Sequence, residues 1–185
     1  MVASLNPAWN EPATDADVDK RFEEASKLMG EQFLKKLDFY GKAWLPAQDI
    51  VVRALEENEN LDPQGRILHL PQFCPWKVCF SENFEANKQE HLFDLEEERG
   101  IIGQTLYILF PDNTPPAYRI QAMPLTSDSF ENRKALPAEW RGLRDDELSA
   151  KSGIPGCIFV HAAGFIGGNK KFEGALQMAR KALEL

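Results

Sequence analysis

The sequence predicts a mixed α/β (α+β) fold, in which a helical N-terminal region precedes a central sheet with helices. Three features lead to this prediction. Between Asp17 and Tyr40, apolar residues recur with the three-and-four spacing of an amphipathic helix. The runs 104–110 and 118–123 flank the turn-rich stretch PDNTPPA, which indicates a β-hairpin. From residue 156 onward, the pattern is that of a strand, a glycine turn and a helix.

The N-terminal region is expected to contain two helices. Thr14 or Asp15 can cap the first, because a short polar side chain accepts a hydrogen bond from a free N–H group of the first turn. Gly41 is expected to end this helix. The second is predicted to begin at Pro46, whose missing N–H needs no partner in a first turn, and to run to about Glu57.

Shorter elements are expected in the middle of the chain. We predict a polar turn at 58–65, a short strand at 66–70 and a charged helix at 90–99. An ordered loop at 127–142 leads to a short helix at 144–151.

The C-terminal pattern divides into three pieces. A continuous apolar strand is predicted at 156–162, a turn at Gly164–Gly168 and a helix at 169–183.

Composition narrows the class of protein. With 185 residues, of which 43% are hydrophobic, the chain can bury a sizeable core as one globular unit. No stretch approaches the roughly 20 apolar residues of a membrane helix, and the first residues do not resemble a signal peptide. The three cysteines suit a reducing compartment. We expect a soluble, intracellular protein that does not bind membranes.

Charge is distributed unevenly along the chain. The net charge of -8 argues against bulk attraction to nucleic acid. Residues 1–115 hold 11 Lys and Arg against 21 Asp and Glu, whereas residues 116–185 hold 10 against 8. An anion site is therefore expected in the last part of the chain.

The glycine-rich segment HAAGFIGGNKKFEGA is the main candidate for such a site. Glycines let a backbone approach a ligand closely, and a helix start presents free N–H groups to an anion. His161, Asn169, Lys170 and Lys171 could complete a phosphate cradle. The alternative is that the glycines only let a strand and a helix pack closely.

Four arginines are further candidates for phosphate contact, because a guanidinium group binds phosphate oxygens in a two-pronged fashion. They could equally sit in solvent or pair with acids such as Asp145, and we expect the latter for one of Arg141 and Arg144. The four are Arg119, Arg133, Arg141 and Arg144.

Cys74 and Cys79, flanked by His69 and His91, have residue types that bind zinc. The spacing is loose and no second pair follows, so buried thiols are the favoured interpretation. A metal site built from the two histidines and acidic neighbours is the remaining alternative. No nucleophile elbow, P-loop or HExxH helix is visible.

The segment SGIPGCIFVHAAGFIGGNKKFEGALQMARKAL resembles the C-terminal part of the melanocyte-proliferating-gene (MYG) exonuclease family, within the DHH phosphoesterase superfamily. Further matching stretches are SFENRKALPAEWRGLRDDEL, YRIQAMP, CPWK with HLFDLEEE, LDFYGKAWLPA and LNPAWNEP, so the resemblance covers nearly the whole chain. Two departures stand out. Asn169 occupies the place where the superfamily favours histidine, and Val78–Gln89 interrupts the segment between CPWK and HLF.

The resemblance implies a role in a nuclease that trims RNA from its 3′ end. In that superfamily an N-terminal domain holds manganese or magnesium, and its metal motifs have no counterpart here. The C-terminal domain would hold the phosphate, so we expect no catalytic or metal-binding residue in this chain. The implied substrate-binding residues are His161, Gly167, Gly168, Asn169, Lys170, Arg141 and Arg144.

We accordingly expect a helical N-terminal region at 1–60 and an α/β substrate-binding domain at 61–185. The expected partners are single-stranded RNA or another phosphodiester, and the metal-binding DHH domain in cis or in trans. Alone, the chain is predicted to be inactive and to bind no metal; a homo-oligomer is left open. By resemblance it belongs in the nucleus or mitochondrion, with the cytoplasm as an alternative. The competing hypothesis is a non-catalytic interaction module or a shortened paralogue.

Overall fold

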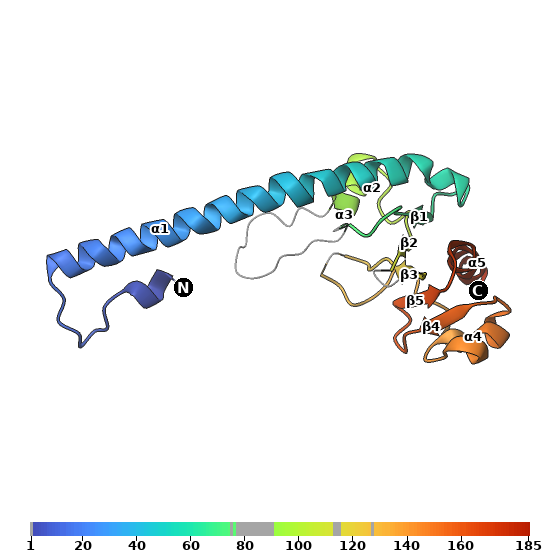
Figure 1. The fold of residues 1–185 in the computed structure, drawn as a ribbon. Helices are drawn as coiled ribbons and strands as arrows, with labels where there is room; N and C mark the ends of the chain where they lie inside the picture. Colours follow the sequence, from blue (N-terminus) through green and yellow to red (C-terminus); the bar gives the residue numbers. More distant parts are fainter. Residues whose placement is uncertain (1, 75, 77–90, 113–115, 127) are drawn as a thin grey trace. The chain divides into compact units, whose positions relative to one another are not determined.

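A computed structural model describes residues 2–74, 76, 91–112, 116–126 and 128–185 (Figure 1). The interruption Val78–Gln89 noted in the sequence lies outside the described residues. The chain divides into two compact units, residues 1–46 and 47–185. None of the helices among the described residues has the length and apolar character needed to cross a membrane.

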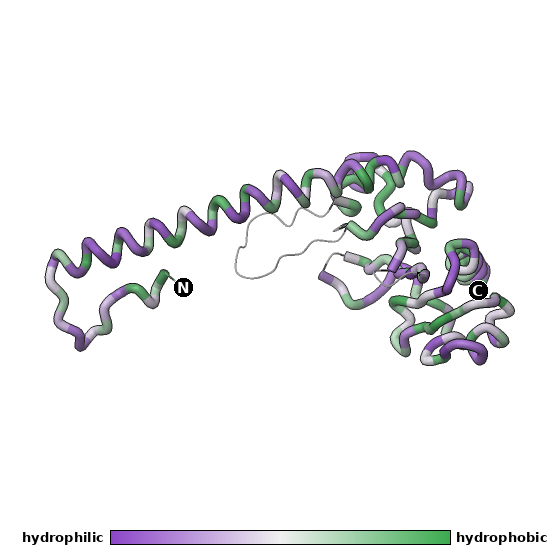
Figure 2. Tube along the Cα trace, viewed as in Figure 1, coloured by the Kyte–Doolittle hydropathy of each residue, from purple (hydrophilic) through white to green (hydrophobic). Residues whose placement is uncertain are grey.

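The first unit is mainly one long helix. A short 3-10 turn, η1 (Val2–Leu5), precedes α1 (Asp15–Phe39). Of the two predicted caps, Thr14 is the N-cap: its Oγ1 accepts a hydrogen bond from the Asp17 N–H at 3.3 Å, and the Asp17 carboxylate accepts one from the Thr14 N–H at 2.9 Å. Hydrophilic and hydrophobic residues alternate along α1 (Figure 2).

The prediction that Gly41 ends this helix is wrong. The helical backbone continues through a π-helical turn, η2 (Tyr40–Trp44), into α2 (Leu45–Glu57). Gly41 does not take the left-handed conformation of a helix-ending glycine. The second helix is confirmed, with Pro46 in its first turn.

A five-stranded mixed sheet organises the second unit, in the order β1-β2-β3-β5-β4. β1 pairs with β2 in parallel, and all other neighbours are antiparallel. The hairpin expected from the two runs around PDNTPPA is confirmed as β2 and β3. The mixed α/β fold class is likewise confirmed. The strands are β1 (Ile67–His69), β2 (Tyr107–Pro111), β3 (Tyr118–Ala122), β4 (Cys157–Val160) and β5 (Ile166–Asn169).

Short helical elements precede, separate and follow these strands in the chain. The polar turn predicted at 58–65 contains a short 3-10 turn, and the helices predicted at 90–99 and 144–151 are confirmed within about two residues. The elements are η3 (Asn58–Asn60), α3 (His91–Glu98), η4 (Ala138–Trp140), α4 (Asp145–Ser152) and α5 (Phe172–Glu184).

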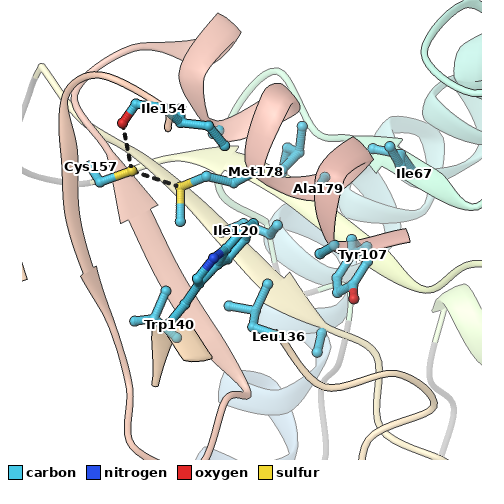
Figure 3. Close-up of a cluster of buried hydrophobic side chains, with 14 of the residues drawn as sticks. Ile67, Tyr107, Ile120, Leu136, Trp140, Ile154, Cys157, Met178 and Ala179 are labelled. Carbon is cyan, nitrogen blue, oxygen red and sulfur yellow. Dashed lines mark hydrogen bonds between the residues drawn. The ribbon is translucent and has the colours of Figure 1, made fainter. Parts of the chain in front are cut away.

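Alternation along the strands creates two hydrophobic clusters, one on each face of the sheet. On one face, α5 packs its small residues against Ile67, Tyr107 and Ile120, with Met178 and Trp140 completing the cluster (Figure 3). The other face buries different strand residues beneath α2 and α3. That second cluster includes Leu68, Ile108, Phe110, Val51, Leu55, Leu92 and Leu95.

The predicted C-terminal sequence of strand, turn and helix needs one correction. Gly164 lies in a turn, with φ +73°, but Gly167 and Gly168 belong to the additional strand β5, and α5 begins only at Phe172. Glycine has little intrinsic preference for strands, so the local pattern favoured a turn. The segment becomes a strand because it fits between β3 and β4 and pairs with both.

Candidate functional site

The hairpin of β4 and β5 separates residues that the sequence placed in one cradle. His161 follows β4, and its N–H donates to the Ile166 carbonyl at 2.9 Å. Lys170 follows β5, and its N–H donates to the Gly156 carbonyl at 2.9 Å, at the other end of the hairpin. Because a strand rises about 3.3 Å per residue, the backbones of His161 and Lys170 lie roughly 13 Å apart along it. The structure does not gather them at one point.

Gly167 faces the core. A Cβ atom there would lie 3.0 Å from the Phe159 carbonyl oxygen and 3.2 Å from Leu136 Cδ1, so a side chain would be crowded against the packed interior. The backbone of β5 is engaged with a strand on each side. Gly167 thus allows the central strand to lie close to its neighbours.

Asn169 is 1% exposed, and both polar atoms of its side-chain amide form hydrogen bonds within the protein. Its Nδ2 donates to the Pro155 carbonyl at 3.0 Å, and its Oδ1 accepts from the Lys171 N–H at 3.0 Å. Gly174 makes room for this amide, because a Cβ there would lie 2.3 Å from Asn169 Cγ. Asn169 therefore joins the end of β5 to the start of α5.

One row of side chains crosses the sheet on the face opposite α5. Phe110 of β2 pairs with Arg119 of β3, Arg119 with Gly168 of β5, and Gly168 with Phe159 of β4. An isolated bridge joins Phe159 to Arg144, beyond the edge of the sheet. Since directly paired residues share a face, these five residues form one line, which we call the cross-sheet row.

The two arginines of the cross-sheet row flank one aromatic ring. The Arg119 Cζ atom lies 5.0 Å from the centre of the Phe159 ring, and the Arg144 Cζ atom lies 5.8 Å from it. A guanidinium group over an aromatic face is attracted by the electrons of the ring. Gly168 leaves space for this arrangement, because a Cβ there would lie 2.9 Å from Arg119 Nη1.

Arg119 is only partly satisfied by its neighbours. Its Nη2 forms an ion pair with Asp112, and its side chain is 24% exposed. Its Nη1 is buried and has no hydrogen-bond partner among the described residues. Arg144 is exposed and its side chain has no ion pair with a described residue. The cross-sheet row can therefore offer an anion the Arg144 guanidinium and the exposed part of the Arg119 side chain.

The other two arginine candidates have structural partners. Arg141 Nε donates to the Leu136 carbonyl at 2.9 Å, beside Gly164. Arg133 is 7% exposed and forms an ion pair with the buried carboxylate of Glu96 at 2.7 Å. Arg141 remains exposed and Arg133 does not.

The sequence analysis missed Phe159, because it lies within a continuous apolar run typical of a buried strand. A signal for the polar face of the sheet, on which Phe159 lies, was available in YRIQA. There Arg119 and Gln121 alternate with Tyr118, Ile120 and Ala122. Such alternation places both polar residues on one face of β3, away from the α5 cluster.

No group of three or more His, Cys, Asp or Glu side chains able to hold a metal ion occurs among the described residues. Cys74 is buried, and burial raises the pKa of its thiol to about 11. Cys79 and the His91 side chain lie outside the part that the structure describes. For Cys74, this burial agrees with the interpretation of a buried thiol.

The sequence model of the MYG1 exonuclease family, described as an uncharacterised protein family (UPF0160), matches residues 1–183. The chain belongs to the MYG1 exonuclease family. It is 50% identical over 182 residues to the MYG1 protein of Dictyostelium discoideum, covering 98% of this chain and 51% of that protein. It is 45% identical over 183 residues to the MYG1 exonuclease of Homo sapiens, covering 98% of this chain and 45% of that protein.

The chain spans about half the length of these curated MYG1 relatives. No solved structure matches it. The resemblance identified from the sequence segments is thereby confirmed at the level of the family.

Proposed function

We propose that this chain is the substrate-holding half of a MYG1 exonuclease and that it binds a nucleic-acid strand, with single-stranded RNA as the favoured substrate. The observation that carries the proposal is the cross-sheet row, in which Arg119 and Arg144 flank Phe159 beside Gly168. Family membership supports a nucleic-acid substrate, since the human relative is named an exonuclease.

The chemistry of the cross-sheet row fits a phosphodiester strand. Guanidinium groups bind phosphate oxygens through paired N–H donors, and the row presents the exposed Arg144 side chain together with Arg119, whose side chain is 24% exposed. Phe159 is half-buried and can add apolar or stacking contact with a base. A strand lying across β3, β5 and β4 would thus meet charge and an aromatic side chain in succession.

The remaining predicted residues fit this proposal in different ways. His161 and Lys170 are exposed at opposite ends of the β4–β5 hairpin, where they could contact nucleotides on either side of the row. Arg141 is exposed beside the Gly164 turn. Gly167 and Asn169 would act by shaping β5, because both are buried within the unit.

Manganese or magnesium, expected for the complete enzyme, would supply an activated water for phosphodiester cleavage. The described residues provide no donor cluster for such an ion. We therefore assign this chain only the binding and positioning of the substrate, and assign the metal to a DHH domain in cis or in trans. A nuclear or mitochondrial location belongs to the same proposal.

Fluorescence anisotropy with a short labelled single-stranded RNA tests the proposal. Removing one charge-assisted contact costs about 1.5–3 kcal/mol, so Arg119→Ala and Arg144→Ala should each weaken binding at least about tenfold. Arg53→Ala, at an exposed position on α2, is the matched control and should bind like the wild type. Affinity of the wild type should also fall as salt rises.

Equal binding by all three variants and the wild type would show that the cross-sheet row does not hold RNA. No binding by any of them would favour the alternative of an interaction module. A DNA strand of the same sequence distinguishes recognition of ribose hydroxyls from recognition of phosphates alone.

A further inference from the structure

The long helix α1 carries large apolar side chains that are exposed along one side. None of its residues is buried. Large hydrophobic side chains are nevertheless exposed along it, with 72% exposure at Phe22 and 66% at Phe33. The apolar side chains that line one side of the helix, continued by Tyr40 at the start of η2, form what we call the α1 stripe: Val18, Phe22, Met29, Phe33, Leu37 and Tyr40.

The spacing of the α1 stripe is suited to helix pairing. Its members follow at intervals of three, four or seven residues, which keeps them on one side of an α-helix. Exposed apolar surface that is contiguous and bordered by charges marks an interaction site. The N-terminal residues cover only part of the stripe and leave a pocket of about 420 Å³, lined by Leu5, Phe22 and Met29 among others.

Charge along α1 indicates what the stripe pairs with. Residues 15–26 contain five acidic and two basic side chains, whereas residues 27–42 contain four basic and two acidic ones. The helix thus has an acidic first half and a basic second half. Two such helices attract each other when they run antiparallel and repel each other when they run parallel.

We propose that α1 forms an antiparallel helix pair with α1 of a second copy of this chain. An alignment that sets Phe22 of one copy against Phe33 of the other also sets Val18 against Leu37. In the same alignment, Asp19 of each copy lies level with Lys36 of the other. Apolar contact and charge complementarity therefore favour one register.

A lipid surface fits the same helix less well. Amphipathic helices that lie on membranes carry mainly Lys and Arg on their polar side, because lipid head groups are commonly anionic. The polar residues of α1 include acidic side chains at Asp17, Glu23, Glu24 and Glu31, which would oppose that attraction.

Sedimentation velocity of the intact chain, from about 1 μM to about 100 μM, tests the proposal. The wild type should shift from monomer to dimer over this range. Phe22→Glu combined with Phe33→Glu should raise the dissociation constant at least about tenfold. Since both residues are exposed, circular dichroism of the variant should show an unchanged helix content.

A charge exchange tests the register. The chain with Asp19→Lys and the chain with Lys36→Asp should each dimerise more weakly than the wild type, because like charges then meet at both ends of the pair. A mixture of the two should recover dimers, since the lysine introduced in one chain would lie level with the aspartate introduced in the other. A monomeric wild type at the highest concentration would overturn the proposal, as would a dimer unaffected by the Phe22 and Phe33 changes. Failure of the mixture to recover dimers would overturn the register. None of these results depends on RNA binding.

Discussion

Replacing Glu96 by glutamine should destabilise the second unit, because this carboxylate is the partner of a buried arginine. Glu96 is 1% exposed and the Arg133 side chain 7% exposed. The two Glu96 oxygens accept hydrogen bonds from Arg133 Nη1 at 2.9 Å, the Thr105 N–H at 3.0 Å and the Gly103 N–H at 3.2 Å. The pair thus connects α3 with two loops.

The size of the expected loss in the free energy of unfolding follows from this burial. Removing one member of a buried ion pair costs about 3–5 kcal/mol, because the remaining charge stays away from water without compensation. Gln can still accept a hydrogen bond from a backbone N–H, so for Glu96→Gln we expect the lower end, about 3 kcal/mol. Such a loss is a large part of a typical domain stability of about 5–15 kcal/mol.

Urea unfolding followed by tryptophan fluorescence measures the effect, since Trp76 and Trp140 are buried in the second unit. Glu97→Gln, at the exposed neighbouring position, is the matched control and should change the free energy of unfolding by less than about 0.5 kcal/mol. A double variant, Glu96→Leu with Arg133→Met, should cost less than the sum of the single changes. A cost below about 1 kcal/mol for Glu96→Gln would refute the reasoning, because the arginine would then be compensated without this carboxylate.

Three further predictions concern single side chains. Asp112→Asn should strengthen RNA binding in the anisotropy assay, because the ion pair with Asp112 competes with phosphate for Arg119; unchanged or weaker binding would argue against contact between Arg119 and RNA. Burial lowers the pKa of His69, so the folded state binds its proton less readily than the unfolded state does. The free energy of unfolding should therefore decrease as pH falls below the ordinary histidine pKa of about 6.5, and His69→Phe should reduce this slope. An identical slope in the variant would assign the pH dependence to other groups. Finally, because the thiol pKa of Cys74 is about 11, Ellman's reagent at neutral pH should modify this cysteine only slowly in the native protein and rapidly in urea. Cys74→Ser identifies its share of the signal, and rapid native labelling of Cys74 would contradict its burial.

The sequence by itself determined the elements that depend on local interactions. The spacing in α1 and the cap at Thr14 involve residues three or four positions apart, so they could be found without a structure. The hairpin of β2 and β3 was equally visible, because two strand-like runs flank a turn-rich stretch. The family also followed from the sequence, since the matching segments extend along nearly the whole chain.

Only the tertiary structure decided which residues meet. The cross-sheet row joins Phe110, Arg119, Arg144, Phe159 and Gly168, and its order depends on the pairing of strands that are far apart in the chain. The strand β5 was not predicted because its glycines carry no strand preference of their own, and pairing on both sides makes it a strand. The same pairing places His161 and Lys170 at opposite ends of a hairpin. Strand register is a long-range property, because it is set by contacts that a single segment does not contain.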